Sequence, residues 1–454
     1  MNITVFFILF AILGIFYSII GYKASTSIKS LDDYFLAGRK LGLFALTITL
    51  IATQLGGGVI LGTSRESYNV GLYGLLYVVS ITMGFIILAS GIAARLRRFN
   101  VNTTAELFET RYKSIFLKKC ASVFSMISLG GLLVAQVVAS RNLMLSLNVY
   151  HELFFIFFWF FVIGYTMLGG LRAIVNNDIF QLSFIISVFC GIFVYELFTN
   201  SSGIINTLFY SPAQFIVPQT FDLSRVFAII LIPACYSLIE QDIAQTIFAA
   251  RTPRVAVVGT FLAGLFMILF SFIPVYFGMK AQILGMVIPE GANPLIYLFD
   301  TSYSPLIVTL VVYGVFAAII STADALLCAI SSHLVQDFNL AHNSKHALDI
   351  SKAVMGAVGI ITLIIGHYFT NIIDVIVGSY DIPVCTLFVP LMICYFSDKL
   401  SKSGAYLSVF MGLTGFILFK VLKIYPVFSP EATSLFMSAC GYILGMLYDK
   451  IKFQ

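Results

Sequence analysis

The chain has 454 residues, of which 59% are apolar and only 10% are charged. A soluble protein carries about 25% charged residues to keep its surface in water, so this composition excludes a soluble globular protein and indicates a surface that faces lipid. The net charge of +5 is spread over short segments between apolar stretches. That distribution excludes a nucleic-acid-binding protein, whose basic residues gather on one face.

The apolar segments predict an all-α polytopic membrane protein, because about twenty helical residues cross the hydrocarbon core of a bilayer. The first segment has no basic head and no small-residue cleavage site, so we expect a retained span rather than a signal peptide. No soluble linker interrupts the series, which predicts a single transmembrane domain over residues 1–454. The expected spans, about thirteen in number, are 3–22, 42–62, 70–94, 117–148, 151–171, 173–197, 223–248, 254–279, 304–338, 352–369, 370–397, 403–422 and 432–449.

The basic residues predict how these spans are oriented. Counted over alternate loops, 20 of the 26 Lys and Arg residues fall on the side that holds the C-terminus. Cytoplasmic loops of membrane proteins carry the excess of Lys and Arg. We therefore expect a multi-pass protein of the inner (plasma) membrane, with its N-terminus outside and its C-terminus in the cytoplasm.

The second span contains a run of three glycines near its midpoint. The three glycines are Gly56, Gly57 and Gly58, and Thr53 and Gln54 come shortly before them. Each glycine destabilises a helix by about 1 kcal/mol relative to alanine. An unwound segment is tolerated at membrane depth only where it lines a cavity or binds something. The sequence predicts such a break, with close packing against a neighbouring helix as the alternative.

The seventh span carries a similar signal. Pro233 interrupts its hydrogen bonding, and the polar side chains of Tyr236, Ser237, Glu240 and Gln241 follow. Two interrupted helices at matching places in two halves of a chain are typical of inverted-repeat transporters. We expect repeats at about 42–197 and 223–397, with peripheral helices at 3–22, 403–422 and 432–449.

The ninth span presents two adjacent hydroxyl groups on a face of small residues. Ala318, Ser321, Thr322 and Ala325 are spaced so that they share one side of a helix. Together with main-chain carbonyl groups freed in the second span, these hydroxyls suit a small monovalent cation. The alternative is that both hydroxyls bond back to the carbonyls of their own helix.

Two carboxylates are expected inside the membrane on the inner side of this cation. Asp324 lies one turn beyond Ser321, and Asp178 lies near the inner end of the sixth span. Buried charge in a bilayer is costly and marks ion pathways and proton relays. The pair suits an inward exit path for the ion or a second cation site, whereas Asp178 could also be a solvated residue at the helix mouth.

Five spaced motifs resemble the sodium/solute symporter family, which includes bacterial sodium/proline and sodium/pantothenate symporters and sodium/glucose cotransporters. The resemblance covers nearly the whole chain. The motifs are residues 33–39 (DYFLAGR), 52–58 (ATQLGGG), 169–178 (GGLRAIVNND), 241–251 (QDIAQTIFAAR) and 321–327 (STADALL).

The resemblance implies a LeuT-like 5+5 inverted-repeat core and a sodium site. That site would take the main-chain carbonyls of Ala52, Leu55 and Ala318 and the hydroxyls of Ser321 and Thr322. Asp178 would help the ion to leave inward, and Asp324 stands where some relatives place a hydroxyl of a second sodium site. A carboxylate in that position is suited to a proton as well as to sodium.

Three positions depart from the family's pattern. Pro233 and Ser237 stand where sodium/proline symporters place an aromatic pair over their substrate, which argues against proline as the solute. Thr246 stands where many relatives have Arg, and nothing in the sequence explains that change.

We therefore expect a sodium-coupled symporter, not an enzyme, that imports a small organic solute such as an amino acid, carboxylate, vitamin or sugar. Na+ is the expected coupling ion, and the expected partners are the solute and the lipid bilayer. The solute is expected beside residues of the two breaks. Glu240 and Gln241 could bind an amine or hydroxyl groups of the solute, or they could line the cytoplasmic vestibule instead. A proton-coupled carrier and a transporter-like solute sensor are the alternatives. The residues expected at the solute are Gln54, Gly56, Gly57, Gly58, Tyr236, Ser237, Glu240 and Gln241.

Overall fold

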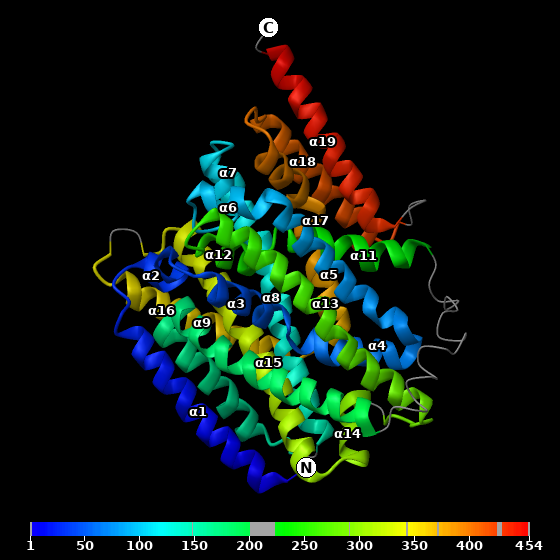
Figure 1. Ribbon diagram of the computed structural model, residues 1–454. Helices are drawn as coiled ribbons and strands as arrows, with labels where there is room; N and C mark the ends of the chain where they lie inside the picture. Colours follow the sequence, from blue (N-terminus) through cyan, green and yellow to red (C-terminus); the bar gives the residue numbers. More distant parts are fainter. Residues whose placement is uncertain are drawn as a thin grey trace.

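A computed structural model describes residues 2–147, 149–199, 223–289, 291–341, 344–369, 372–424 and 429–452. These residues form helices joined by short turns (Figure 1). The helices are α1 Ile3–Ser25, α2 Leu31–Leu36, η1 Ala37–Arg39, α3 Leu43–Gln54, η2 Gly58–Gly62, α4 Thr63–Val70, η3 Gly71–Leu75, α5 Leu76–Ile87, η4 Leu88–Ile92, α6 Ala93–Phe99, α7 Glu106–Thr110, α8 Ile115–Ser146, α9 Glu152–Thr199, α11 Leu223–Ser237, α12 Gln241–Phe248, α13 Pro253–Ile283, α14 Pro294–Ser302, α15 Pro305–Ser332, η6 His333–Asp337, α16 Ala347–His367, α17 Ile372–Phe396, α18 Lys402–Phe416, η7 Ile417–Val421 and α19 Pro430–Lys452.

Nine helical stretches in the described part of the chain are long and apolar enough to cross a membrane. The all-helical prediction is confirmed, whereas the number of thirteen spans stays a prediction. One reason for the difference is that the expected spans 151–171 and 173–197 form one helical run, α9. A second reason is that the second and seventh spans are each divided into shorter helices.

Helix α9 is 48 residues long and kinks at Gly170, where φ is 50° and ψ is −151°. A straight helix of that length would measure about 72 Å, more than twice the hydrocarbon thickness of about 30 Å. The residues before the kink reach α15, where Tyr165 donates a hydrogen bond to Asp324, and Asp178 follows the kink. The predicted pair of spans is therefore present, but no loop separates its members.

Both predicted breaks are confirmed as interruptions of a helix. The first helix, α3, ends at Gln54, and Leu55 leaves helical geometry with a ψ of 43° before the chain resumes as η2 and α4. In the seventh span, α11 ends at Ser237 and α12 begins at Gln241. That break lies one turn after Pro233, which itself remains inside α11.

The two broken helices are joined at one end by a short parallel pairing of main chains. Leu41 donates its N–H to the carbonyl of Ala249 at 3.0 Å, and its own carbonyl accepts from Arg251 at 2.8 Å. Leu41 lies just before α3 and Ala249 just after α12. The beginning of one broken helix is thereby tied to the end of the other.

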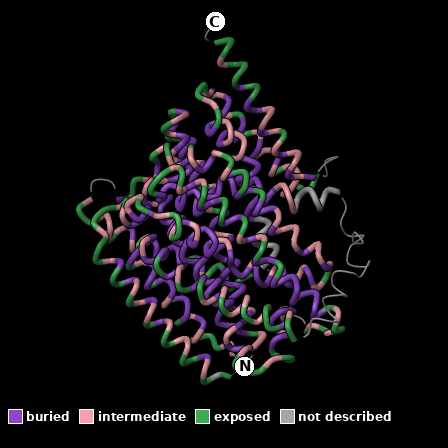
Figure 2. The backbone as a smooth tube through the Cα atoms, in the orientation of Figure 1, coloured by how far each residue is buried: buried purple, intermediate pink, exposed green. Residues whose placement is uncertain are grey.

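Helix α15 occupies the centre of the molecule. In its most apolar window 83% of the residues are buried, against 22% in α1. Figure 2 shows the same contrast, with buried residues in the middle and exposed ones along α1 and the outer part of α19. A helix that is both apolar and fully surrounded is well placed to hold a site away from lipid.

Candidate ion and solute site

The unwound segment after α3 lies directly against α15. A Cβ atom added to Gly56 would stand 2.6 Å from Oγ1 of Thr322, and one added to Gly57 would stand 3.2 Å from Ile319. The Gly57 N–H, which no longer has a helical partner, donates to Oε1 of Gln136 on α8 at 3.2 Å. The expectations of an unwound segment and of close packing are therefore both met, because the absence of side chains allows the approach.

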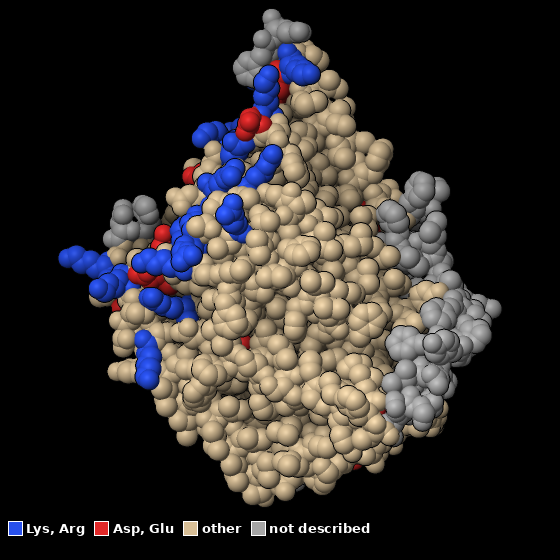
Figure 3. All heavy atoms as spheres, viewed as in Figure 1, with Lys and Arg blue, Asp and Glu red and all other residues tan. Residues whose placement is uncertain are grey.

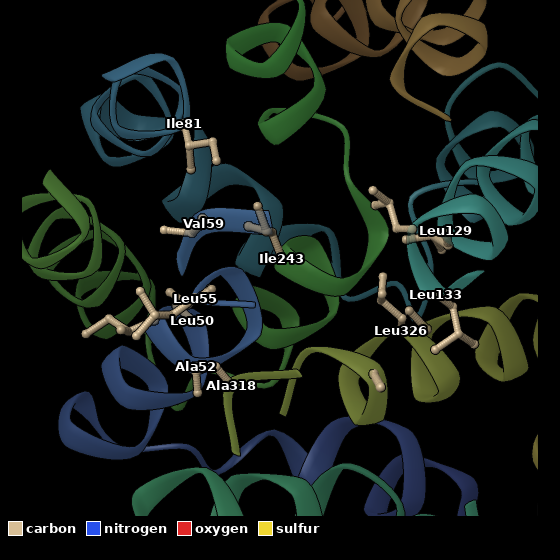
Figure 4. Close-up of a cluster of buried hydrophobic side chains, with 14 of the residues drawn as sticks. Leu50, Ala52, Leu55, Val59, Ile81, Leu129, Leu133, Ile243, Ala318 and Leu326 are labelled. Carbon is tan, nitrogen blue, oxygen red and sulfur yellow. The ribbon is translucent and has the colours of Figure 1, made fainter. Parts of the chain in front are cut away.

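The two hydroxyls of α15 reach across to the last carbonyls of α3. The Ser321 hydroxyl lies 2.9 Å from the carbonyl oxygen of Ala52 and 3.1 Å from that of Ala318. The Thr322 hydroxyl donates to the carbonyl of Thr53 at 2.8 Å. Ser321 is fully buried and Thr322 is 9% exposed, and Figure 4 shows Ala52 and Ala318 side by side at this contact.

This contact gathers five oxygen groups from two helices. The alternative of back-bonding accounts for only one of the hydroxyl contacts, that of Ser321 with Ala318. The carbonyl of Thr53 joins that of Ala52 as a hydrogen-bond acceptor, which the sequence analysis did not anticipate. Hydroxyl and carbonyl oxygens without a formal charge suit a monovalent hard cation, and the described residues contain no group of three His, Cys, Asp or Glu side chains that would suit a transition metal.

Asp178 is fully buried on the far side of the kink in α9. Neither oxygen of its carboxylate has a hydrogen-bond partner among the described residues, and the same is true of the amide groups of Asn177 and Gln181. Thr49 on α3 faces the carboxylate and also lacks a well-formed hydrogen bond. The interpretation of Asp178 as a solvated residue at a helix mouth is therefore wrong.

Asp324 is also fully buried, but its carboxylate is well satisfied. Thr166 donates to Oδ1 at 2.5 Å, and Tyr165 donates to Oδ2. Both donors come from α9, just before its kink. The sequence analysis missed these two residues, because a tyrosine and a threonine in an apolar span give no signal until the kink places them opposite α15.

The break between α11 and α12 forms the second part of the site. Gln54, from the end of α3, donates to Oε2 of Glu240 at 3.4 Å, so the two breaks meet. Tyr236 accepts a hydrogen bond from Ser128 on α8 at 2.9 Å. Its ring lies 4.5 Å from that of Tyr380 on α17, whose hydroxyl is 2.8 Å from that of Tyr77 on α5.

Two more of the predicted solute residues, Ser237 and Gln241, also have partners within the protein. Ser237 donates to the carbonyl of Pro233 one turn earlier, at 2.9 Å. The Gln241 amide bonds to the main chain of the segment after α6, accepting from Thr104 at 2.7 Å and donating to Asn102 at 3.3 Å. The sequence analysis did not predict Tyr77, Ser128 or Tyr380 at this break. The chain has 23 tyrosines, and nothing in the sequence marks which of them, or which serine, packs beside Tyr236.

Comparisons with known proteins agree with this architecture. A structure described as the substrate-bound outward-open state of a Na+-coupled sialic acid symporter superposes with a TM-score of 0.78 at 16% identity, covering 96% of this chain and 95% of that one. Mhp1, a nucleobase-cation-symport-1 family transporter with bound bromovinylhydantoin, gives 0.60 at 13% identity, over 93% and 96%. At such identities the likeness establishes the fold, which is the LeuT-like fold of these transporters.

The family is established by sequence. The profile of the sodium:solute symporter family matches residues 34–412, which include both broken helices and all of α15. It begins within the first of the five motifs. The chain belongs to the sodium:solute symporter family, as a multi-pass membrane protein that couples transport to Na+.

Proposed function

We propose that this protein imports a small organic solute together with sodium by alternating access. The observation that carries the proposal is the contact of Ser321 and Thr322 with the carbonyls of Ala52 and Thr53 at the end of α3. In the proposed site, sodium takes the carbonyls of Ala52, Leu55 and Ala318 and the hydroxyls of Ser321 and Thr322. The ion then links the broken helix to α15.

Linking these helices gives sodium its effect on the solute. The unwound segment bearing Gly56, Gly57 and Gly58 meets the α11–α12 break through Gln54 and Glu240. An ion that holds the first segment in place preorganises a solute site formed by both breaks, with Tyr236 and Ser237 beside it and Gln241 fixing the start of α12. One charge moving through 100 mV provides about 2.3 kcal/mol, which is about fiftyfold accumulation of solute per sodium.

We propose that Asp178 and Asp324 bind the ion on its inward path after it leaves the site at Ser321 and Thr322. Both are fully buried, and Asp178 has free carboxylate oxygens among the described residues. A second cation or an ion on its inward path would satisfy these oxygens. A proton would satisfy them as well, so proton coupling is the second candidate function. Uptake that persists without sodium and stops when the proton gradient alone is removed would favour it.

The orientation is part of the proposal. Figure 3 shows the Lys and Arg residues of this face in a band from the C-terminal tip down the left edge, with none visible at the end that bears the N-terminus. This distribution supports an N-terminus outside the cell and a cytoplasmic C-terminus in the plasma membrane.

The double variant S321A/T322A tests the sodium site. Purified protein is compared in sodium and in potassium buffers by thermal shift with a panel of amino acids, sugars, carboxylates, vitamins and amines. Coupling requires that sodium tighten solute binding as much as solute tightens sodium binding. The double variant should lose this reciprocity, with sodium affinity falling by at least about tenfold, or 1.4 kcal/mol.

The variant S331A is the matched control. Ser331 is a buried hydroxyl on the same helix, and it donates only to the carbonyl of Leu327 one turn before it. It should respond to sodium as the parent does. If the double variant also does so, the sodium site is not at Ser321 and Thr322.

A further inference from the structure

The α11–α12 break places two carboxylates in the interior with no basic partner. Glu240 is 5% exposed and Asp242 is 3% exposed, and their carboxyl groups lie close enough to share a hydrogen bond. None of the Lys and Arg residues in the described part of the chain forms an ion pair with either. The nitrogen donors to the pair are Gln54, at 3.4 Å from Glu240, and the Ile243 N–H, at 2.9 Å from Asp242.

Two adjacent carboxylates in an apolar interior are both ionised only when a cation lies between or beside them, and otherwise they share a proton. Like charges at this range oppose each other's ionisation, and a buried charge without a partner is destabilising by several kcal/mol. Elsewhere in the same protein the buried carboxylate of Glu196 has the ammonium group of Lys280. At the α11–α12 break no Lys or Arg of the described residues plays this part, so a cation that pairs with both carboxylates has to come from outside the described part of the chain.

Three tyrosines next to Glu240 indicate what kind of cation fits. Tyr236 stacks near Tyr380, whose hydroxyl meets that of Tyr77, and the Glu240 carboxylate interacts electrostatically with all three phenol groups. Aromatic rings attract ammonium groups through their negative faces, more strongly when water is excluded. A bare sodium ion would instead need several oxygen ligands, such as those gathered at Ser321 and Thr322.

The same arrangement disfavours other solutes. An anionic solute would add a third negative charge beside Glu240 and Asp242. A neutral sugar would make no use of the charge of the pair, which would then hold a shared proton. We propose that the transported solute is a small organic cation whose ammonium group sits against Glu240 and Asp242 and beside the rings of Tyr77, Tyr236 and Tyr380. This inference rests on the proposed function and narrows its solute class.

The experiment compares a cation with its uncharged isostere. Choline and 3,3-dimethylbutan-1-ol have the same shape and differ by the charge on one atom. Binding of each to the purified full-length protein is measured by thermal shift and calorimetry, with and without sodium, and ethanolamine is added to represent primary ammonium groups. At least one of the two cations should bind in a sodium-dependent manner, and the neutral isostere should bind at least about thirtyfold more weakly.

The variant E240Q locates the charge. It should weaken cation binding by about thirtyfold or more, since one partner of a buried charge pair is removed, while sodium still stabilises the protein. The control E152Q makes the same change at an exposed glutamate and should leave cation binding unchanged. The comparison of choline with its isostere uses only the parent protein, so it holds even if E240Q does not fold.

The outcomes separate this inference from the function on which it rests. If neither cation binds, if the isostere binds as well as choline, or if E240Q retains full cation affinity, the ammonium site is wrong. In each of these cases a sodium effect on any other solute would leave the proposed symport intact. If sodium and potassium are equivalent for every solute, sodium symport itself fails.

Discussion

The absence of a side chain at Gly56 allows the main chain to approach the proposed ion site on α15. The main chain of this residue lies so close to α15 that a Cβ atom would stand 2.6 Å from Oγ1 and 3.1 Å from Cβ of Thr322. The Thr322 side chain cannot move away freely, because its hydroxyl donates to the carbonyl of Thr53. The approach of the carbonyls to the hydroxyls therefore depends on glycine at this position.

The variant G56A should push the unwound segment away from α15. We expect a loss of about 1–3 kcal/mol in stability, as for other overpacked interiors, and a weakened response to sodium. Thermal unfolding with increasing sodium measures both. G62A is the control, because a Cβ atom at Gly62 meets nothing within 4 Å. Equal behaviour of the two variants would contradict the close approach.

The two buried aspartates should respond differently to the same substitution. Asp324 accepts from two hydroxyl donors, and asparagine would present an N–H₂ group to one of them. D324N should therefore cost about 1–3 kcal/mol, the price of leaving a buried polar group unsatisfied. Asp178 has no such donors among the described residues, so D178N should cost less. Thermal midpoints in sodium-free buffer give the order, and the reverse order would contradict these contacts.

At the scale of elements, the kink in α9 depends on one residue. Gly170 has a φ of 50°, a region that residues with a Cβ atom rarely adopt, and its missing Cβ would collide with the carbonyl oxygen of Tyr34. G170A should therefore fail to yield folded protein, as judged by monodisperse expression and thermal unfolding. G164A and G191A in the same helix have open space around the added Cβ and should fold normally.

At the scale of elements, some features of the fold and of the site were predictable from the sequence and others were not. The breaks after Gln54 and Ser237 were predictable, because consecutive glycines and a proline act on the local main chain. The shared helix face of Ser321 and Thr322 followed from helical spacing, whereas their place in a sodium site followed from the resemblance to the family. Thr166 and Tyr165 were not predictable as partners of Asp324, since their position depends on how sharply α9 turns at Gly170. Tyr77 and Tyr380 come from helices far apart in the sequence, and only packing brings them to Tyr236.

At the scale of the whole molecule, burial and charge vary along different directions. Burial decreases from α15 outward to α1, whereas the visible basic residues lie in a band from the C-terminal tip down the left edge (Figure 3). The first pattern fits a protein surrounded by lipid, and the second is the distribution on which the proposed orientation rests.

The orientation can be measured with small epitopes fused to each end of the full chain. In intact spheroplasts the N-terminal epitope should be accessible to protease and antibody, and the C-terminal epitope only after the membrane is opened. A cytoplasmic protein serves as the control for integrity. A C-terminal epitope that is cleaved in intact spheroplasts would reverse the assignment of the two faces.

The contact between Tyr34 and the α9 kink also bears on how the protein is made. The Tyr34 hydroxyl donates to the carbonyl of Met167 at 2.8 Å, across 133 positions in sequence, and its main chain lies over Gly170. At ribosomal rates of about 5–20 residues per second, these partners emerge on the order of ten seconds apart. The segment after the first span therefore has no packing partner until the kinked helix α9 has been synthesised.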